Sequence, residues 1–268
     1  METATLQKGL VLVYDGVELV EEGMGFGVPV AIYRDEPYFS STAQCRIYEN
    51  GGRKTLEKSF AMDTVSRKRI GEEAYFNGGL YSIFHRIFHA VYTLNLPLTS
   101  VFERFIASAS AVGFNTEFVR VKPRGFVTLR YALQGDSVLF EASFDHLEKC
   151  GCEQVVLLNE QGADFFERYF DSSGQTLNSS EIGAWQPVRA CEATLHNSRE
   201  KIGFSLRSQP NAVLLRGREA IKGRYSWVGL SYSLRSLKKT FKYFVRLECA
   251  RFENYQEELL RITSSGKT

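Results

Sequence analysis

A pair of histidines in this 268-residue chain has the spacing with the clearest capacity for chemistry. His85 and His89 lie in a stretch whose apolar residues recur at helical intervals, so both side chains fall on one helix face. Zinc hydrolases use this spacing to share a metal ion between two histidines, but a glutamate follows the first histidine there, whereas Arg86 follows it here. A third ligand also cannot be selected from the sequence. We therefore expect no metal ion and treat the two histidines as candidate catalytic groups.

Two tyrosines extend the same stripe. Tyr81 and Tyr92 lie along one line with the histidines, beside the apolar face of the expected helix. If the stripe lines a polar site, these tyrosines contact the ligand. The alternative is the polar boundary of an ordinary amphipathic helix.

Asp145 and His146 form the second candidate catalytic group. They follow a predicted strand, where a carboxylate beside an imidazole is suited to general acid–base catalysis. The alternative is a solvated strand end, because adjacent strand residues point to opposite faces of a sheet.

The charges are segregated along the chain, although the net charge is only +2. Residues 199–251 contain 13 Lys or Arg against three Glu, a net of +10, while residues 136–181 contain ten acidic against two basic residues, a net of −8. If the basic segment is exposed, cations interleaved with rings would bind a sugar or an anionic polysaccharide. The candidates are Arg216, Arg218, Arg224, Tyr225 and Trp227. The alternative is that acidic and basic strands pair across a sheet, and we do not expect nucleic acid as the partner.

The elements that position these groups are mostly strands. Apolar and polar residues alternate in many segments, which is typical of a sheet with one buried face. Short links at Gln134–Asp136 and Asn50–Gly52 indicate antiparallel hairpins. We predict strands over 9–14, 17–20, 28–33, 37–50, 54–61, 127–133, 138–144, 202–206 and 240–250.

Helical spacing replaces alternation at residues 79–112. Two apolar runs separated by Asn95-Leu96-Pro97 predict an inserted αα-hairpin, since proline cannot continue the first helix. The alternative is that part of this segment is strand, because β-branched and aromatic residues are plentiful in it. Short helices are also expected at 160–170 and 253–262, followed by a polar tail at 263–268.

The fold class follows from these elements and the composition. With 44% hydrophobic and 24% charged residues, the chain is unlike collagen, coiled coils, membrane-spanning proteins and disordered chains. We predict a mainly antiparallel β protein, a single large two-sheet sandwich over residues 1–262 with the helical insertion. The alternative is an α+β protein with two β subdomains.

Cysteine usage favours a reducing compartment. The five cysteines are odd in number and scattered, and the first residues lack the pattern of an export signal. We expect a cytoplasmic protein without membrane association.

No motif specifies a reaction or a cofactor, so the predicted function depends on the fold. Large β sandwiches often bind carbohydrate on a concave sheet face, and we predict a carbohydrate-binding or carbohydrate-processing protein. One alternative is a carrier for an apolar ligand, suggested by 20 Phe and 13 Tyr. The other is a non-catalytic interaction module, a homo-oligomer joined through the helical hairpin.

Overall fold

The computed structural model describes residues 5–14, 17–19, 24–34, 36–50, 53–70, 114–162, 165–183, 185–221 and 225–249, and the structural statements below concern these residues. The predicted helices at 79–112 and 253–262 and the tail at 263–268 lie outside them. Within the described ranges, no helix has the length and apolar character needed to cross a membrane.

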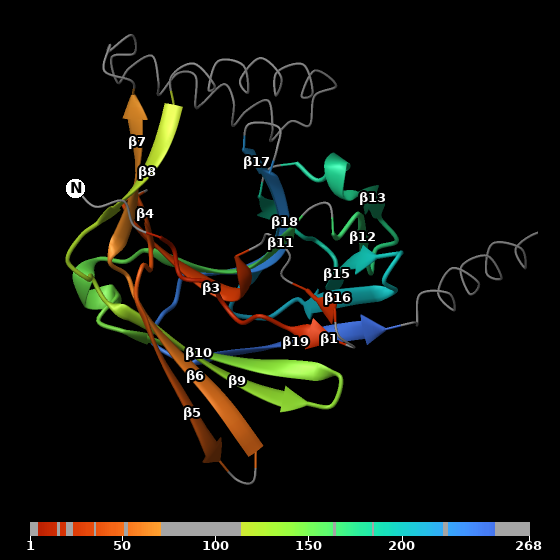
Figure 1. Ribbon diagram of the computed structural model, residues 1–268, viewed down its shortest axis with the longest axis horizontal. Helices are drawn as coiled ribbons and strands as arrows, with labels where there is room; N and C mark the ends of the chain where they lie inside the picture. The colour runs from red at the N-terminus through yellow and green to blue at the C-terminus, as the bar shows by residue number, and fades with distance from the viewer. Residues whose placement is uncertain are drawn as a thin grey trace, which may run out of the picture.

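Two antiparallel sheets make up the fold, which confirms the predicted antiparallel sandwich (Figure 1). The larger sheet has nine strands and the smaller sheet has eight. In spatial order the larger sheet contains β13 (Thr176–Asn178), β12 (Arg168–Asp171), β15 (Glu192–Asn197), β16 (Ile202–Arg207), β19 (Phe241–Cys249), β10 (Ser137–Asp145), β9 (Phe126–Gln134), β6 (Arg53–Ala61) and β5 (Ala43–Asn50).

The smaller sheet faces the larger one. Its strands are, in spatial order, β14 (Gln186–Pro187), β17 (Val213–Ile221), β18 (Tyr225–Leu234), β11 (Gln154–Gly162), β3 (Gly25–Tyr33), β4 (Glu36–Phe39), β7 (Thr64–Ile70) and β8 (Phe114–Arg120). The strands β1 (Val13–Tyr14) and β2 (Val17–Glu18) pair with each other, and short 3₁₀ turns form at η1 (Glu148–Cys150) and η2 (Ser179–Glu181).

Alternation located most of the strands correctly, and two predictions were wrong. Gln134 pairs with Ser137 and Asn50 with Arg53, so both predicted hairpins form. The expected single strand 37–50 is divided into β4 and β5, which lie in different sheets. The expected helix at 160–170 is also absent from the described residues of that range, where β11 runs to Gly162 and β12 begins at Arg168.

Aromatic rings fill the space between the sheets. The Phe26 ring of β3 meets the Phe204 ring of β16 at 5.0 Å, and Phe166 contacts Phe204 at 5.2 Å. The Phe140 and Tyr243 rings stack at 4.7 Å in the larger sheet. All five side chains are fully buried. The rings therefore account for much of the packed core between the two sheets.

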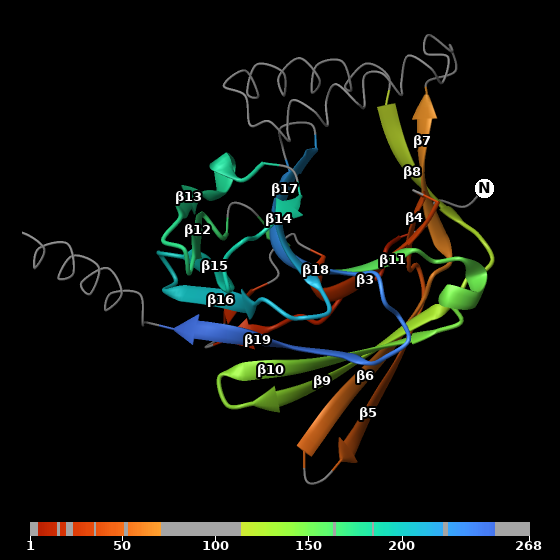
Figure 2. The same ribbon diagram turned by 180° about the vertical axis from the view of Figure 1, so that it is seen from behind.

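The smaller sheet is strongly curved. At its two ends, β17 and the β7–β8 hairpin rise on the same side, away from the larger sheet, as seen from the front in Figure 1 and from behind in Figure 2. The face turned away from the larger sheet is therefore concave, and we call it the concave face.

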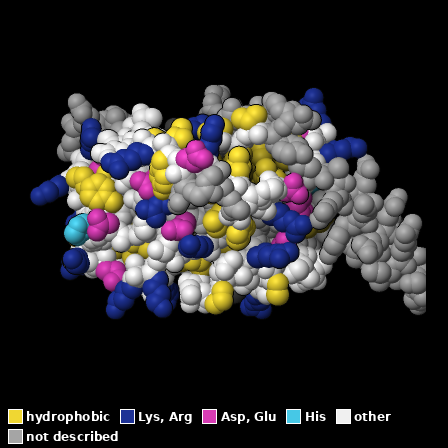
Figure 3. All heavy atoms as spheres, turned by 90° about the horizontal axis from the view of Figure 1, so that it is seen from below, with side chains coloured by type: hydrophobic (Ala, Val, Ile, Leu, Met, Phe, Trp, Pro, Cys, Tyr) yellow, Lys and Arg dark blue, Asp and Glu magenta, His cyan; other side chains and the backbone are white. Residues whose placement is uncertain are grey.

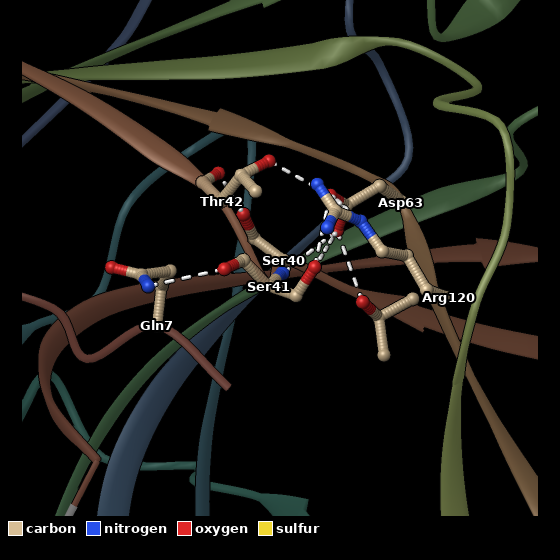
Figure 4. A network of polar contacts seen from close by, with 7 residues as sticks. Gln7, Ser40, Ser41, Thr42, Asp63 and Arg120 are labelled. Atoms are coloured by element: carbon tan, nitrogen blue, oxygen red, sulfur yellow. Dashed lines mark hydrogen bonds and ion pairs between the residues drawn. The ribbon is translucent and has the colours of Figure 1, made fainter. Parts of the chain in front are cut away.

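A buried carboxylate holds one corner of the sandwich together. Asp63, whose side chain is 2% exposed, lies in the link from β6 to β7. It accepts hydrogen bonds from the Ser41 backbone N–H at 2.7 Å and from the Ser41, Thr42 and Thr64 hydroxyls at 2.7–3.0 Å (Figure 4). The Arg120 guanidinium lies 3.8 Å away. These contacts join strand links of both sheets.

Substituting this carboxylate tests its structural role. We expect Asp63→Ala to lower the free energy of unfolding by about 3 kcal/mol, because several buried donors lose their acceptor. The measurement is urea denaturation. The matched control is Asp145→Ala, whose side chain is 71% exposed and whose loss should cost less than about 0.5 kcal/mol. Equal effects of the two substitutions would contradict a structural role for Asp63.

Candidate ligand-binding face

Tyr232 on β18 shows which side chains reach the concave face. Its ring packs 4.9 Å from the ring of Tyr243 in the larger sheet, so Tyr232 points inward. Because side chains alternate along a strand, Ser231, Gly229 and Trp227 point the other way. These residues therefore belong to the concave face.

A row of glycines crosses the concave face. Gly217 on β17 is directly opposite Gly229 on β18, Gly229 is opposite Glu160 on β11, and Glu160 is opposite Gly25 on β3. Directly opposite residues share a face of the sheet, so Glu160 is the one residue of this row with a side chain. The row therefore lacks side chains at Gly217 and Gly229, which leaves room over the backbone at these two positions.

The indole of Trp185 occupies part of that space. Its segment passes along the β17 edge, where the Gly183 carbonyl accepts a hydrogen bond from the Arg218 backbone N–H at 3.0 Å. A Cβ atom added at Gly217 would lie 2.3 Å from Cδ2 of Trp185, and one added at Gly229 would lie 2.9 Å from Cη2. Only glycine at both positions allows the indole to lie this close to the sheet.

Polar groups accompany the tryptophans on this face. Trp227 is directly opposite Gly162, two residues beyond Glu160 on β11, and both indoles are partly exposed. Glu160 is 5% exposed and Ser231 is fully buried. The Ser231 hydroxyl has no hydrogen-bond partner within the part of the chain that the structure describes. The face thus combines two indoles, a carboxylate and a hydroxyl.

Two of the predicted arginines, Arg216 and Arg218, lie on the opposite side of the same strand pair. Arg216 is directly opposite Leu230 and Arg218 is opposite Val228, and both partners are buried between the sheets. The Arg216 guanidinium sits 4.6 Å over the Tyr169 ring and donates a hydrogen bond to the Gln175 side chain at 2.8 Å. These arginines therefore do not share a surface with Trp227.

Asp145 and His146 lie close together but in an open position. The His146 Nε2 atom is 3.4 Å from a carboxylate oxygen of Asp145, and the side chains are 57% and 71% exposed. His146 follows the last residue of β10 with a φ of 62°, which turns its ring back toward the carboxylate. The pair lies in the larger sheet and so is not part of the concave face.

The remaining predicted site residues cannot be placed. Tyr81, His85, His89, Tyr92 and Arg224 lie outside the described residues, and only the backbone of Tyr225 is described, at the start of β18. Among the described side chains, no three His, Cys, Asp or Glu groups come together as metal ligands.

The opposite charges of the two segments meet in the larger sheet. Glu57, Arg130, Glu141 and Lys242 are directly opposite one another on the consecutive strands β6, β9, β10 and β19. Arg130 contacts Glu57 at 2.8 Å and Glu141 at 3.3 Å, and Lys242 contacts Glu141 at 2.8 Å. Figure 3 shows acidic and basic side chains interspersed on the side seen from below. We call these four residues the charge ladder. They agree with the alternative in which acidic and basic strands pair across a sheet.

Sequence reasoning did not find Trp185 and Glu160. Neither belongs to a motif, and the signal that links them is the opposition of Gly217 to Gly229 and of Gly229 to Glu160. That opposition depends on the registers of strands distant in sequence, which composition and periodicity do not contain.

A double-mutant cycle tests whether the Trp185 indole lies against Gly217. Gly217→Ala should displace the Trp185 ring and lower the free energy of unfolding by about 1–3 kcal/mol. In a Trp185→Ala background the same change should cost much less, because nothing then occupies the space. Urea denaturation gives the free energy of unfolding of all four proteins. An equal cost in both backgrounds would show that the ring does not lie against Gly217.

The charge ladder predicts a pH-dependent stability. Hydrogen bonding to Lys242 lowers the pKa of Glu141, so the folded state binds its proton more weakly than the unfolded state does. Glu141→Gln should therefore cost about 0.5–1 kcal/mol at pH 7, and the cost should disappear as the pH falls from about 5 to about 3.

The control for this measurement is Glu148→Gln, because Glu148 is exposed in η1. Its effect should be small at every pH. A cost for Glu141→Gln that stays constant between pH 3 and 7 would contradict the ladder.

Comparisons with known proteins define no family for this chain. No family model and no curated protein matches it. A solved α-N-acetylgalactosaminidase from Bifidobacterium bifidum has 11% identity and a TM-score of 0.45, covering 96% of this chain and 36% of its own. The Slr1438 protein from Synechocystis sp. PCC 6803 has 8% identity and a TM-score of 0.33, covering 91% of this chain and 76% of its own. The function of this chain must therefore be inferred from its own concave face.

Proposed function

We propose that this protein binds a carbohydrate on the concave face of its smaller sheet. The observation that carries the proposal is that both tryptophans of the chain, Trp185 and Trp227, belong to this face together with Glu160. Ligand sites combine aromatic walls with a few placed polar groups. A sugar ring has a C–H face that stacks on an indole and hydroxyl groups that donate to a carboxylate.

The accessible part of the face lies at the two indoles. The floor side chains Val28 and Val30 of β3 are 3% and 6% exposed, so they are covered. Trp185 and Trp227 are partly exposed and flank the glycine row. A sugar bound there rests on the rings and presents its hydroxyls toward Glu160, which is directly opposite Gly229 and next to the Trp185 indole.

Charge favours a neutral sugar over an anionic polysaccharide. An anion bound at the glycine row would approach the carboxylate of Glu160, which is nearly buried. Lys242 and Arg130 of the larger sheet are already paired with carboxylates, and Arg216 and Arg218 point between the sheets. Among the described side chains of the basic segment, Arg216 and Arg218 therefore lie on the other side of the sheet from the tryptophans.

Binding accounts for this arrangement better than hydrolysis. Most glycosidases need two carboxylates about 5–9.5 Å apart. The described side chains of the glycine row supply one, Glu160, and Glu219, directly opposite Trp227, is described by its backbone alone. The carrier alternative is also weaker, because the aromatic rings that suggested it pack against one another between the sheets.

Glycan-array binding by the full chain, followed by calorimetry on the retained sugar, tests the proposal. We expect Trp185→Ala and Trp227→Ala each to weaken binding about tenfold or more, because each removes a stacking surface. Glu160→Gln should weaken it as well, through loss of a charged acceptor.

The matched control is Phe244→Ala on β19. Phe244 is 46% exposed and belongs to the larger sheet, away from the concave face. This variant should bind as the wild type does. The absence of any retained sugar, or an equal loss in the Phe244 variant, would refute the proposal.

A further inference from the structure

We infer that this protein forms a homodimer in which the β5 strands of two copies pair antiparallel. β5 is the last strand of the larger sheet, with β6 as its neighbour on one side. Residues 44–49 of β5 are all exposed, so the other edge faces water. An exposed strand edge presents unpaired backbone N–H and C=O groups to another strand. This inference is independent of the proposed sugar binding.

The edge lacks most of the features that prevent pairing. β5 has eight residues in unbroken register with β6 and contains no proline or glycine. The opposite end of the sheet, β13, has three residues, and the edge strand β14 of the smaller sheet has two. Short edges of that kind are protected by their length. At the centre of β5, Ile47 is 76% exposed, which is costly for an isolated strand.

The β5 sequence is complementary to itself in one register. A twofold axis perpendicular to the sheet keeps each face continuous, so opposed residues come from the same face. With the axis at Ile47, the Ile47 side chains of the two copies meet on one face. On the other face Arg46 meets Tyr48 of the second copy, a favourable cation–π pairing.

The neighbouring registers are less favourable. An axis at Arg46 opposes two arginines, and an axis at Glu49 opposes two glutamates. An axis at Tyr48 places Ile47 opposite Glu49 of the other copy. A second copy of this chain, paired about Ile47, is therefore the occupant that the exposed edge fits best.

Sedimentation of the full-length protein tests the inference. The wild type should have twice the 30.4 kDa chain mass. Ile47→Lys should be monomeric at the same concentration, because it opposes two charges at the axis. Leu133→Lys is the matched control, since Leu133 is 73% exposed in the same sheet but lies on β9. It should remain dimeric. A monomeric wild type, or equal loss of the dimer in both variants, would overturn the inference.

A disulfide test examines the register. In a Cys45→Ser background, Ile47→Cys should cross-link the copies on mild oxidation, because directly opposed Cα atoms lie about 4.5–5.5 Å apart, within disulfide range. Tyr48→Cys should not cross-link, because its counterpart is displaced by two residues along the strand. Circular dichroism verifies that both variants are folded. Cross-linking through position 48 rather than 47 would overturn the register about Ile47.

Discussion

The sandwich depends on a single buried carboxylate at the place where the chain repeatedly changes sheets. Asp63 lies in the link from β6 to β7, and its hydroxyl donors Ser41 and Thr42 lie in the link from β4 to β5. Its own carbonyl accepts a hydrogen bond from Val121 in the link from β8 to β9. Three crossovers between the sheets thus meet at one residue. A buried charge with this many donors is stable only if all of them stay in place, so it fixes the relative position of the crossing segments.

The concave face depends on this corner and on the absence of side chains farther along the sheet. β4 and β7, whose ends meet at Asp63, belong to the wall opposite β17. On the other side, Gly217 and Gly229 allow the Trp185 indole to lie against the backbone. The Asn159 side chain supports the floor on its inner side, where it accepts a hydrogen bond from Gly27 N–H and donates one to the Leu230 carbonyl. One polar residue thus stabilises a bulged strand pair next to Glu160.

The sequence predicted the elements well where the alternation was regular, as in β9, β10, β16 and β19. It failed in β11, because the inward positions change from Val155 and Leu157 to Asn159 and Gln161, all of them buried. Polar residues at buried positions remove the apolar period, so no strand is predicted here and the expected helix at 160–170 overlaps the end of β11. The prediction of one strand over 37–50 failed at Ser40–Thr42, where the chain leaves β4 before it enters β5. Ser41 and Thr42 bind Asp63 there, a residue that follows about twenty positions later in the sequence. Both errors have a non-local cause.

Strand pairing between distant segments also makes the net charge of a segment a poor guide to the surface. The acidic and basic segments supply adjacent strands, β10 and β19, so Glu141 and Lys242 are directly opposed and bonded. On β17, alternation sends both Arg216 and Arg218 inward and leaves Gly217 on the concave face. Beside this glycine, the charge on the concave face is therefore the carboxylate of Glu160, while Arg120 of β8 lies farther along the same sheet. The neutral, hydroxyl-rich ligand that we propose would be recognised at the glycine row through rings and hydrogen bonds.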